Sequence, residues 1–276
     1  MKLRVVELLL VTTIPTMVLA RDGWPSIHLM VITLIGGTLA AGGANAINMY
    51  IDRDIDKLMV RTQNRPLVTG VITPRAAMIF AIALEIVAFC VLFVGANLLA
   101  ACLAISATLF YVFVYSLWLK RTSKQNIVIG GAAGAMPVLV GWAAVTHSLS
   151  WVPIVLFVVI FLWTPPHFWA LAIRHNDDYK AAGIPMLPVV ESLERTVRSM
   201  TTYAVLLTIA TLVLVPVAEL GWIYGITALV FGVAFVIGSV RLGKDPSEKR
   251  AMRLFTFSIS YVTAVFVALT VDVLVR

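Results

Sequence analysis

One stretch of this chain places acidic and basic residues at the end of a long apolar run: Asn48-Met-Tyr-Ile-Asp52-Arg-Asp-Ile-Asp56-Lys-Leu-Met-Val-Arg61-Thr-Gln-Asn-Arg65-Pro-Leu. The apolar run before it, over residues 26–50, is long enough to cross a membrane as a helix. If the helix continues, Asn48, Asp52 and Asp56 share one face at intervals of about 6 Å. The stretch therefore predicts a membrane helix whose end presents an amide and two carboxylates together.

These residue types fit a metal–diphosphate site. Mg²⁺ prefers oxygen ligands, and proteins usually hold it with one or two carboxylates together with substrate phosphates. Arg61 and Arg65, again four residues apart, can bind phosphate oxygens through paired hydrogen bonds. Asp54 faces away from Asp52 on a helix, and we leave it out of the site.

The same charges also fit a simpler interpretation, a solvated helix end in which acidic and basic neighbours pair with one another. The position of these charges favours a function over simple pairing, because ionisable groups at the edge of a membrane core are costly. We therefore expect a diphosphate site at a membrane surface.

Composition shows that most of the chain is membrane-spanning. Hydrophobic residues make up 61% of the 276 residues and charged residues 13%, and the mean hydropathy is +0.97. The apolar runs are too long and too little alternating for the strands of a barrel. We predict an all-α polytopic membrane protein with nine spans, at residues 4–20, 26–50, 76–96, 98–118, 126–146, 150–172, 199–219, 221–241 and 252–274.

Basic residues indicate how these spans are oriented. With the N-terminus inside, the inner segments contain 19 of the 21 Lys and Arg residues, Lys2 among them, and only Arg21 and Arg276 lie outside. This asymmetry predicts a multi-pass protein of the cell membrane with its N-terminus and both acidic loops in the cytoplasm. The net charge of +7 is then a topology signal, and no nucleic-acid partner is expected.

The first span also resembles a signal peptide, because Lys2 and Arg4 precede a short apolar run. The sequence Val18-Leu19-Ala20 is a poor cleavage site, so we keep the segment as a span.

The inner segments alternate in length. Segments 51–75 and 173–198 are long, whereas 119–125 and 242–251 are short. Long segments therefore recur every four helices, which indicates a single domain of residues 1–276 built from two four-helix repeats plus a ninth helix.

The second long segment follows Trp163-Thr-Pro-Pro-His167-Phe-Trp-Ala-Leu-Ala-Ile-Arg174 and continues His-Asn176-Asp-Asp178-Tyr-Lys-Ala-Ala-Gly183-Ile-Pro185-Met-Leu-Pro188. Asn176, Asp177 and Asp178 can provide the facing half of a metal site. Gly183 and the two prolines after it end the helix and shape a lid.

Together these motifs resemble the UbiA-type intramembrane prenyltransferases. The pattern Asn48-x-x-x-Asp52-x-x-x-Asp56, followed by Arg61-Thr62 and Arg65-Pro66-Leu67, looks like the first motif of that family. Three further stretches are similar to its haem-modifying branch: 163–172, 177–188 and Leu119-Lys120-Arg121-Thr-Ser-x-Gln-Asn126. The resemblance covers nearly the whole chain and implies a UbiA-type bundle of nine helices.

The resemblance also implies an activity. It implies transfer of a farnesyl group from farnesyl diphosphate to a vinyl group of haem b, giving haem O and diphosphate, with Mg²⁺ as cofactor. The implied catalytic and metal-binding residues are Asn48, Asp52, Asp56, Asp177 and Asp178. The substrate-binding candidates are Arg61, Arg65, Lys120, Arg121, Tyr179 and His167. The expected partners are farnesyl diphosphate, haem b and the lipid membrane, and the resemblance leaves open whether a haem A synthase is a physical partner.

The chain departs from the wider family in places. Met49 stands where an acid often follows the motif Asn, and Ala182 stands where a second acid often follows Asp178. Both departures agree with the haem branch, and both leave a second metal ion with fewer ligands. The abrupt start at Met1-Lys-Leu-Arg is consistent with a truncated or misassigned start, because the family usually has a longer lead.

Several residues fit more than one role. His167 fits a haem ligand or a structural histidine, and Glu85 fits a proton-relay group or a pair inside the bundle. Tyr111, Tyr115 and Trp118, at i, i+4 and i+7, fit either stabilisation of a cation or simple packing.

The rival functions are a prenyltransferase acting on a quinone precursor and a membrane transporter. Against the transporter, the carboxylates lie at helix ends and not at mid-membrane. Cys90 and Cys102 fit no metal spacing, and we expect both to be buried within spans.

Overall fold

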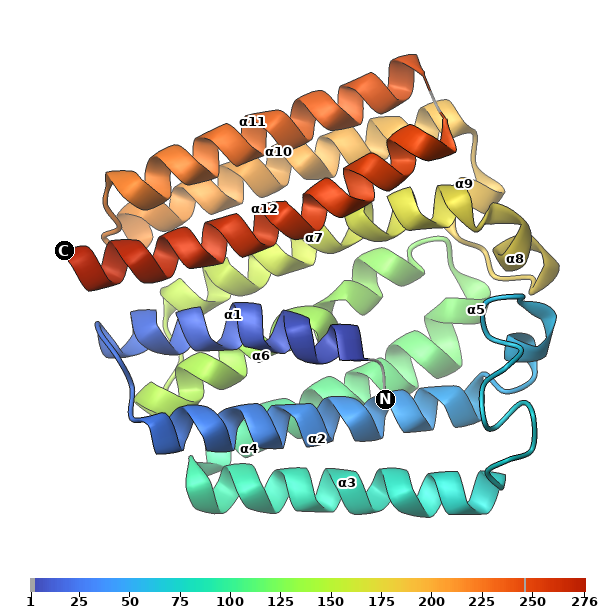
Figure 1. The fold of residues 1–276 in the computed structure, drawn as a ribbon, viewed down its shortest axis with the longest axis horizontal. Coiled ribbons are helices and arrows are strands. Elements are labelled where there is room, and N and C mark those ends of the chain that lie inside the picture. The colour runs from blue at the N-terminus through green and yellow to red at the C-terminus, as the bar shows by residue number, and fades with distance from the viewer. Residues whose placement is uncertain (1–2, 246) are drawn as a thin grey trace.

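The long helices lie side by side in one bundle (Figure 1). The computed structural model describes residues 3–245 and 247–276, with side chains described from residue 11 onward in the first helix, so Lys2 lies outside the described residues. Nine long rods form the described part of the chain: α1 (Leu3–Arg21), α2 (Ile27–Ile51), α3 (Pro74–Gly95), the rod Leu98–Thr122, α6 (Asn126–Thr146), α7 (Trp151–Arg174), α10 (Leu193–Val217), α11 (Trp222–Lys244) and α12 (Glu248–Val275). The all-α prediction is confirmed.

Eight of these rods are long and apolar enough to cross a membrane. The remaining rod, α1, spans 19 residues and packs against α6, α12 and α2. The prediction of nine spans was therefore close: the described part of the chain contains eight helices long and apolar enough to cross a membrane, and α1 packs beside them. The two-repeat organisation stays a prediction.

The predicted boundaries agree with the helices to within a few residues, except at the start of α10. That helix was expected to begin at residue 199 and begins at Leu193. The hydroxyl of Ser192 accepts a hydrogen bond from the N–H of Arg195 at 3.2 Å and so caps the helix. Hydropathy marks only the apolar part of a helix, whereas capping extends the helix through a polar turn outside the membrane core.

The bundle contains two apolar cores of different character. Around α7, α10, α11 and α12 the buried side chains include large ones such as Trp169, Phe235 and Phe266. Between α2, α3, α4 (Leu98–Leu109) and α6 they are mostly alanines: Ala40, Ala88, Ala100, Ala101, Ala104, Ala143 and Ala144. Small side chains let membrane helices approach closely.

Close approach of α2 and α3 accommodates the carboxyl group of Glu85. A Cβ at Gly43 would lie 2.5 Å from Glu85 Oε1, so only glycine fits there without a shift. Glu85 Oε1 accepts a hydrogen bond from the Thr108 hydroxyl at 3.1 Å. Its other oxygen, Oε2, is buried without a hydrogen-bond partner among the described residues, so these contacts leave both interpretations of Glu85 open. Cys90 and Cys102 are exposed on the helix surface, so the expectation that they are buried was wrong.

Both long inner segments lie at one end of the bundle, which we call the loop end (Figure 1). It contains the 3₁₀ turn η1 (Ile55–Leu58), α5 (Lys120–Thr122), α8 (Asn176–Ala181) and α9 (Leu187–Val190). The opposite end, the turn end, contains the short connections at 22–26 and 147–150 and the last turn of α12. An apolar cluster joins the two long segments at the loop end: Ile55, Met59, Ile127, Ala172, Ala182, Ile184 and Met186.

Candidate functional site

The first acidic motif lies where α2 ends. Helical hydrogen bonds continue through it, since the N–H of Asp52 donates to Asn48 O at 2.9 Å and that of Asp56 donates to Asp52 O at 2.8 Å. Asn48, Asp52 and Asp56 are 3%, 0% and 1% exposed, whereas the Asp54 side chain is 61% exposed. The structure therefore places the three predicted ligands on an inward face and Asp54 outside, as the spacing predicted.

A chain of hydrogen bonds orients Asn48 and Asp52. Asn48 Nδ2 donates to Asp52 Oδ2 at 2.7 Å and to Ser116 Oγ at 3.0 Å. The Ser116 hydroxyl donates in turn to Tyr111 O at 2.9 Å, so its oxygen accepts from Asn48 and fixes which way the amide points. Lys120 forms an ion pair with the same Asp52 oxygen.

Asp56 has a comparable arrangement. Arg65 Nη1 lies 2.5 Å from Asp56 Oδ2, and the Thr62 hydroxyl donates to the Asp56 backbone carbonyl at 2.9 Å. Each aspartate therefore has one oxygen bound to a basic side chain.

The second oxygen of each aspartate lacks a partner. Oδ1 of Asp52 and Oδ1 of Asp56 are buried without a hydrogen-bond partner among the described residues. Arg121 Nη2 comes only to 3.9 Å from Asp52 Oδ1, which is too long for a hydrogen bond. A buried carboxylate oxygen without a partner is costly. Two such oxygens, with Asn48 beside them, form a donor set that fits a divalent cation such as Mg²⁺.

The rod opposite this face contains a π-helix, η2 (Phe110–Leu119), that the sequence reasoning missed. Tyr111 and Tyr115 stack with their ring centroids 5.3 Å apart and Ser116 is buried, whereas Trp118 is exposed. The predicted aromatic face assumed 3.6 residues per turn, so Trp118 was wrongly included. π-Helical turns are rare in proteins, and those that occur often lie at functional sites. The periodicity of apolar residues does not reveal them.

The second acidic segment contacts the first through Asp178. Its Oδ1 accepts a hydrogen bond from the N–H of Val60 at 3.3 Å, and its Oδ2 lies 4.0 Å from His175 Nδ1. A cavity of about 340 Å³ lies between the segments, lined by Val60, Arg61, Arg174, His175, Asp177 and Asp178. The structure therefore brings the second acidic pair next to Arg61 of the first motif.

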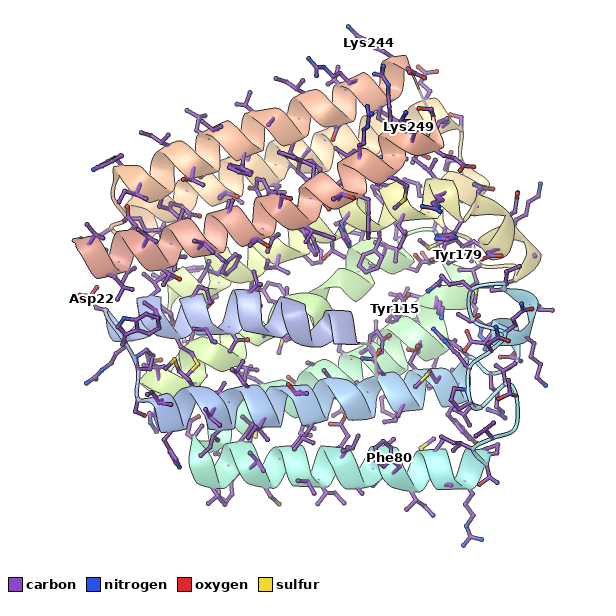
Figure 2. The ribbon with its side chains drawn as sticks, viewed as in Figure 1. Asp22, Phe80, Tyr115, Tyr179, Lys244 and Lys249 are labelled. Atoms are coloured by element: carbon purple, nitrogen blue, oxygen red, sulfur yellow. The ribbon has the colours of Figure 1, made fainter. Side chains whose placement is uncertain are left out.

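Arg61 also affects two titratable neighbours. Burial and the charge of Arg61 lower the pKa of His175, so its imidazole is neutral near pH 7. Burial raises the pKa of Tyr179, while the charge of Arg61 and a hydrogen bond from it act in the opposite direction. Tyr179 and Tyr115 both pack against the apolar cluster of the loop end, and Figure 2 shows both toward that end.

The two basic residues after the fourth rod bind different carboxylates. Lys120 pairs with buried Asp52, whereas Arg121 donates two hydrogen bonds of 2.7 Å to exposed Asp54. The Arg121 guanidinium lowers the pKa of Asp54 to about 2. Lys120 thus lies within the site and Arg121 at its rim, where contact with a diphosphate requires it to leave Asp54.

His167 is buried between α7 and α12. Its ring stacks between Trp163 and Phe255, with centroid distances of 4.2 and 4.5 Å, and its Nδ1 lies 2.6 Å from Ser258 Oγ. Ser258 Oγ donates to the Phe255 carbonyl, so it accepts from Nδ1–H. These contacts favour the structural histidine, and a substrate role for His167 stays a prediction.

The five predicted metal ligands do not form a single cage. Within the described part of the chain, no three His, Cys, Asp or Glu side chains come close enough to hold a metal ion by themselves. Three of the predicted ligands lie at the end of α2 and two at the cavity between the loops. A site with few carboxylates per ion agrees with Mg²⁺ that is bound together with phosphates. The ligand roles stay predictions.

Comparison with known proteins gives the family of this fold. Residues 9–262 match the UbiA prenyltransferase family. Most of the chain is covered, so this protein belongs to that family, and the predicted membership is confirmed. A transporter is therefore not supported.

Curated relatives cover nearly the full length. A protoheme IX farnesyltransferase of Frankia casuarinae is 52% identical over all of this chain and 96% of its own length. One of a Parafrankia species is 53% identical over 98% of this chain and 87% of its own.

Solved structures share the fold at low identity. The structure of a digeranylgeranylglyceryl phosphate synthase superposes with a TM-score of 0.82 at 19% identity, covering 99% of this chain and 95% of that one. A UbiA homologue from Archaeoglobus fulgidus bound to GPP and Mg²⁺ has a TM-score of 0.67 at 19% identity, with 97% of each chain covered. The predicted UbiA-type bundle is confirmed.

Proposed function

We propose that this protein transfers the farnesyl group of farnesyl diphosphate to a vinyl group of haem b. The terminal vinyl carbon bonds to the allylic carbon as its C–O bond to diphosphate breaks, and water adds its oxygen to the other vinyl carbon and releases a proton, which gives haem O and diphosphate. Relatives that share about half of its residues along the whole chain are protoheme IX farnesyltransferases. The observation that carries the proposal is the pair of buried aspartates, Asp52 and Asp56, each with one oxygen on a basic residue and one without a partner.

The chain's own residues divide the work of releasing diphosphate. Asn48, Asp52 and Asp56 would hold the cation, and Lys120 and Arg65 could exchange their aspartate oxygen for a diphosphate oxygen. Mg²⁺ bound there would neutralise charge on the leaving diphosphate, which lowers the barrier to breaking the allylic C–O bond. A UbiA homologue from Archaeoglobus fulgidus bound to GPP and Mg²⁺ supports the use of a divalent cation with a prenyl diphosphate.

The second segment completes the site in this proposal. Asp177 and Asp178 would take part in binding a second cation, and Arg61, which lines the same cavity, would bind non-bridging oxygens of the diphosphate. Tyr111 and Tyr115 present stacked rings that exclude water from the allylic carbon. A haem A synthase as a physical partner stays a prediction.

Product analysis tests the function. Purified protein in lipid nanodiscs, supplied with haem b, farnesyl diphosphate and Mg²⁺, should form haem O and release one diphosphate per product. The matched control is Asp52→Ala, which should form none. Prenylation of a quinone precursor with no haem product would favour the alternative acceptor and overturn the proposal.

We also propose that the loop end faces the cytoplasm. The excess of basic residues at this end supports that orientation, and charged farnesyl diphosphate would then reach the site without crossing the membrane core. Single cysteines at Gln63 and Lys180 should react with an impermeant thiol reagent only from the cytoplasm, and one at Ser148 only from the other side. Cys90 and Cys102 are first replaced by Ala. Labelling of Gln63 and Lys180 from opposite faces would contradict a single site.

A further inference from the structure

A second cavity lies on α12, outside the site described above. It is an open groove of about 810 Å³ at the loop end, lined by one face of α12 together with Arg174 of α7. That volume is within the range of sites for organic ligands of moderate size, on the order of 300–1,000 Å³. The aspartates of the first motif do not line it, so the groove needs its own explanation.

The groove is strongly basic at one end. Three of its lining residues are cations, Arg174, Lys249 and Arg253, and one is an anion, Glu248. No described residue forms an ion pair or side-chain hydrogen bond with the three cations. By contrast, Arg250 on the neighbouring face of α12 lies 2.8 Å from an oxygen of Asp245. The groove therefore has three unpaired cations and, with Glu248, a net charge of +2.

The other end of the groove reaches toward the membrane core. From Lys249 to Ser260 the helix rises about 16 Å, and Phe257 lies along that path. Figure 2 shows Lys249 at the loop end of α12. A ligand that fits this lining has anionic groups at one edge and an apolar body.

The groove also adjoins the candidate site. Arg174 lines both the groove and the cavity that contains Asp177 and Asp178. A molecule bound along α12 with its acidic edge on Arg174 would therefore lie next to the second acidic segment. An acceptor for the prenyl group must be bound in such a neighbouring position.

We propose that this groove binds the haem acceptor, with the two propionate carboxylates on Arg174, Lys249 and Arg253 and the porphyrin body along Phe257. The proposal rests on the proposed function, because that function supplies the haem. Two carboxylates match the two excess charges, and Arg residues form paired hydrogen bonds with carboxylates. The three cations are positioning residues that orient the vinyl edge relative to the farnesyl diphosphate.

Haem titration followed in the Soret band tests the assignment. The triple variant Arg174→Gln, Lys249→Gln, Arg253→Gln should raise the Kd of haem b at least about tenfold, because three charge-assisted contacts are lost. Arg198→Gln, an exposed cation at the loop end outside the groove, should leave the Kd unchanged. Haem b dimethyl ester, which lacks the carboxylates, should bind wild type and triple variant equally weakly.

Several outcomes would overturn the assignment. An unchanged Kd of haem b in the triple variant would do so, as would tight binding of the dimethyl ester to wild type. Loss of phosphatidylglycerol binding in nanodiscs with an unchanged haem Kd would identify a lipid site instead. Retained stabilisation of the triple variant by Mg²⁺ and farnesyl diphosphate shows that it is folded.

The same assay separates the groove from the proposed function. In turnover measurements the double variant Lys249→Gln, Arg253→Gln, which keeps Arg174 of the diphosphate cavity, should raise KM for haem b and leave KM for farnesyl diphosphate unchanged. A wild-type protein that binds haem through the three cations and yet makes no haem O would contradict the proposed function and leave the groove assignment standing.

Discussion

Buried carboxylates at the two ends of the bundle have opposite surroundings. At the turn end, Asp272 accepts hydrogen bonds from the N–H of Gly221 at 2.5 Å and from that of Tyr224 at 3.1 Å, so both of its oxygens have partners. At the loop end, Asp52 and Asp56 each have one oxygen without a hydrogen-bond partner among the described residues. All three side chains are almost fully buried.

The difference separates a structural carboxylate from a functional one. Asp272 caps the first turn of α11 from the neighbouring helix, where a negative charge also favours the helix dipole. Its bonding is complete within the protein. Asp52 and Asp56 each keep one oxygen without a partner, which the cation of the proposed function would complete, and a fold tolerates such a cost where a function depends on it.

The largest expected effect tests this separation directly. Asp52→Ala and Asp56→Ala should each lower turnover by about 10²–10³-fold or more, because a group that stabilises the leaving diphosphate is lost. Asp272→Ala should leave turnover per folded molecule within about threefold and should lower the Tm, because two backbone donors lose their partner. Turnover is normalised to the monodisperse fraction, and the Tm is measured on the same samples.

Asp272→Ala serves as the matched control, since it removes an equally buried carboxylate. If it abolished turnover in properly folded protein, burial alone would explain the effect at Asp52, and the distinction between the two ends would fail.

A smaller effect should appear in thermal stability. Mg²⁺ with diphosphate, at about 100 times its Kd, should raise the Tm of wild type by about 5 °C, because a ligand that binds only the folded state stabilises it. Asp272→Ala should show the same shift from its lower starting point, and Asp52→Ala should show none. The shift should vanish with excess chelator. An equal shift in Asp52→Ala would place the cation elsewhere.

Much of this fold was predictable from the sequence because the membrane imposes simple rules. Apolar run length predicted the rods, and the i, i+4 spacing correctly separated buried Asp52 from exposed Asp54. The start of α10 depended on a Ser192 cap in a polar turn that hydropathy does not detect.

The site was predictable only in part. The motif residues were found, but the Ser116 bond to Asn48 depends on a π-helical turn, which leaves no periodic signature. The sequence analysis took the groove cations only as a signal of membrane orientation. They line one groove with Arg174 only because α7 and α12 pack together.

The smallest expected effect concerns Asp54, the acid of the first motif that points outward. Asp54→Ala should change turnover by less than about threefold, because its carboxylate binds Arg121 at the surface and exposed pairs contribute little. The pKa of Asp54 is lowered to about 2, so its stabilising charge is fully present above its ordinary pKa of 3.8 and is lost only as the pH falls from there toward 2. The small difference in Tm between Asp54→Ala and wild type should therefore be the same at about pH 6 and about pH 8. A loss of turnover as large as that of Asp52→Ala would show that both faces of the helix end take part in binding the cation. Burial without a hydrogen-bond partner would then no longer distinguish the functional carboxylates from the others.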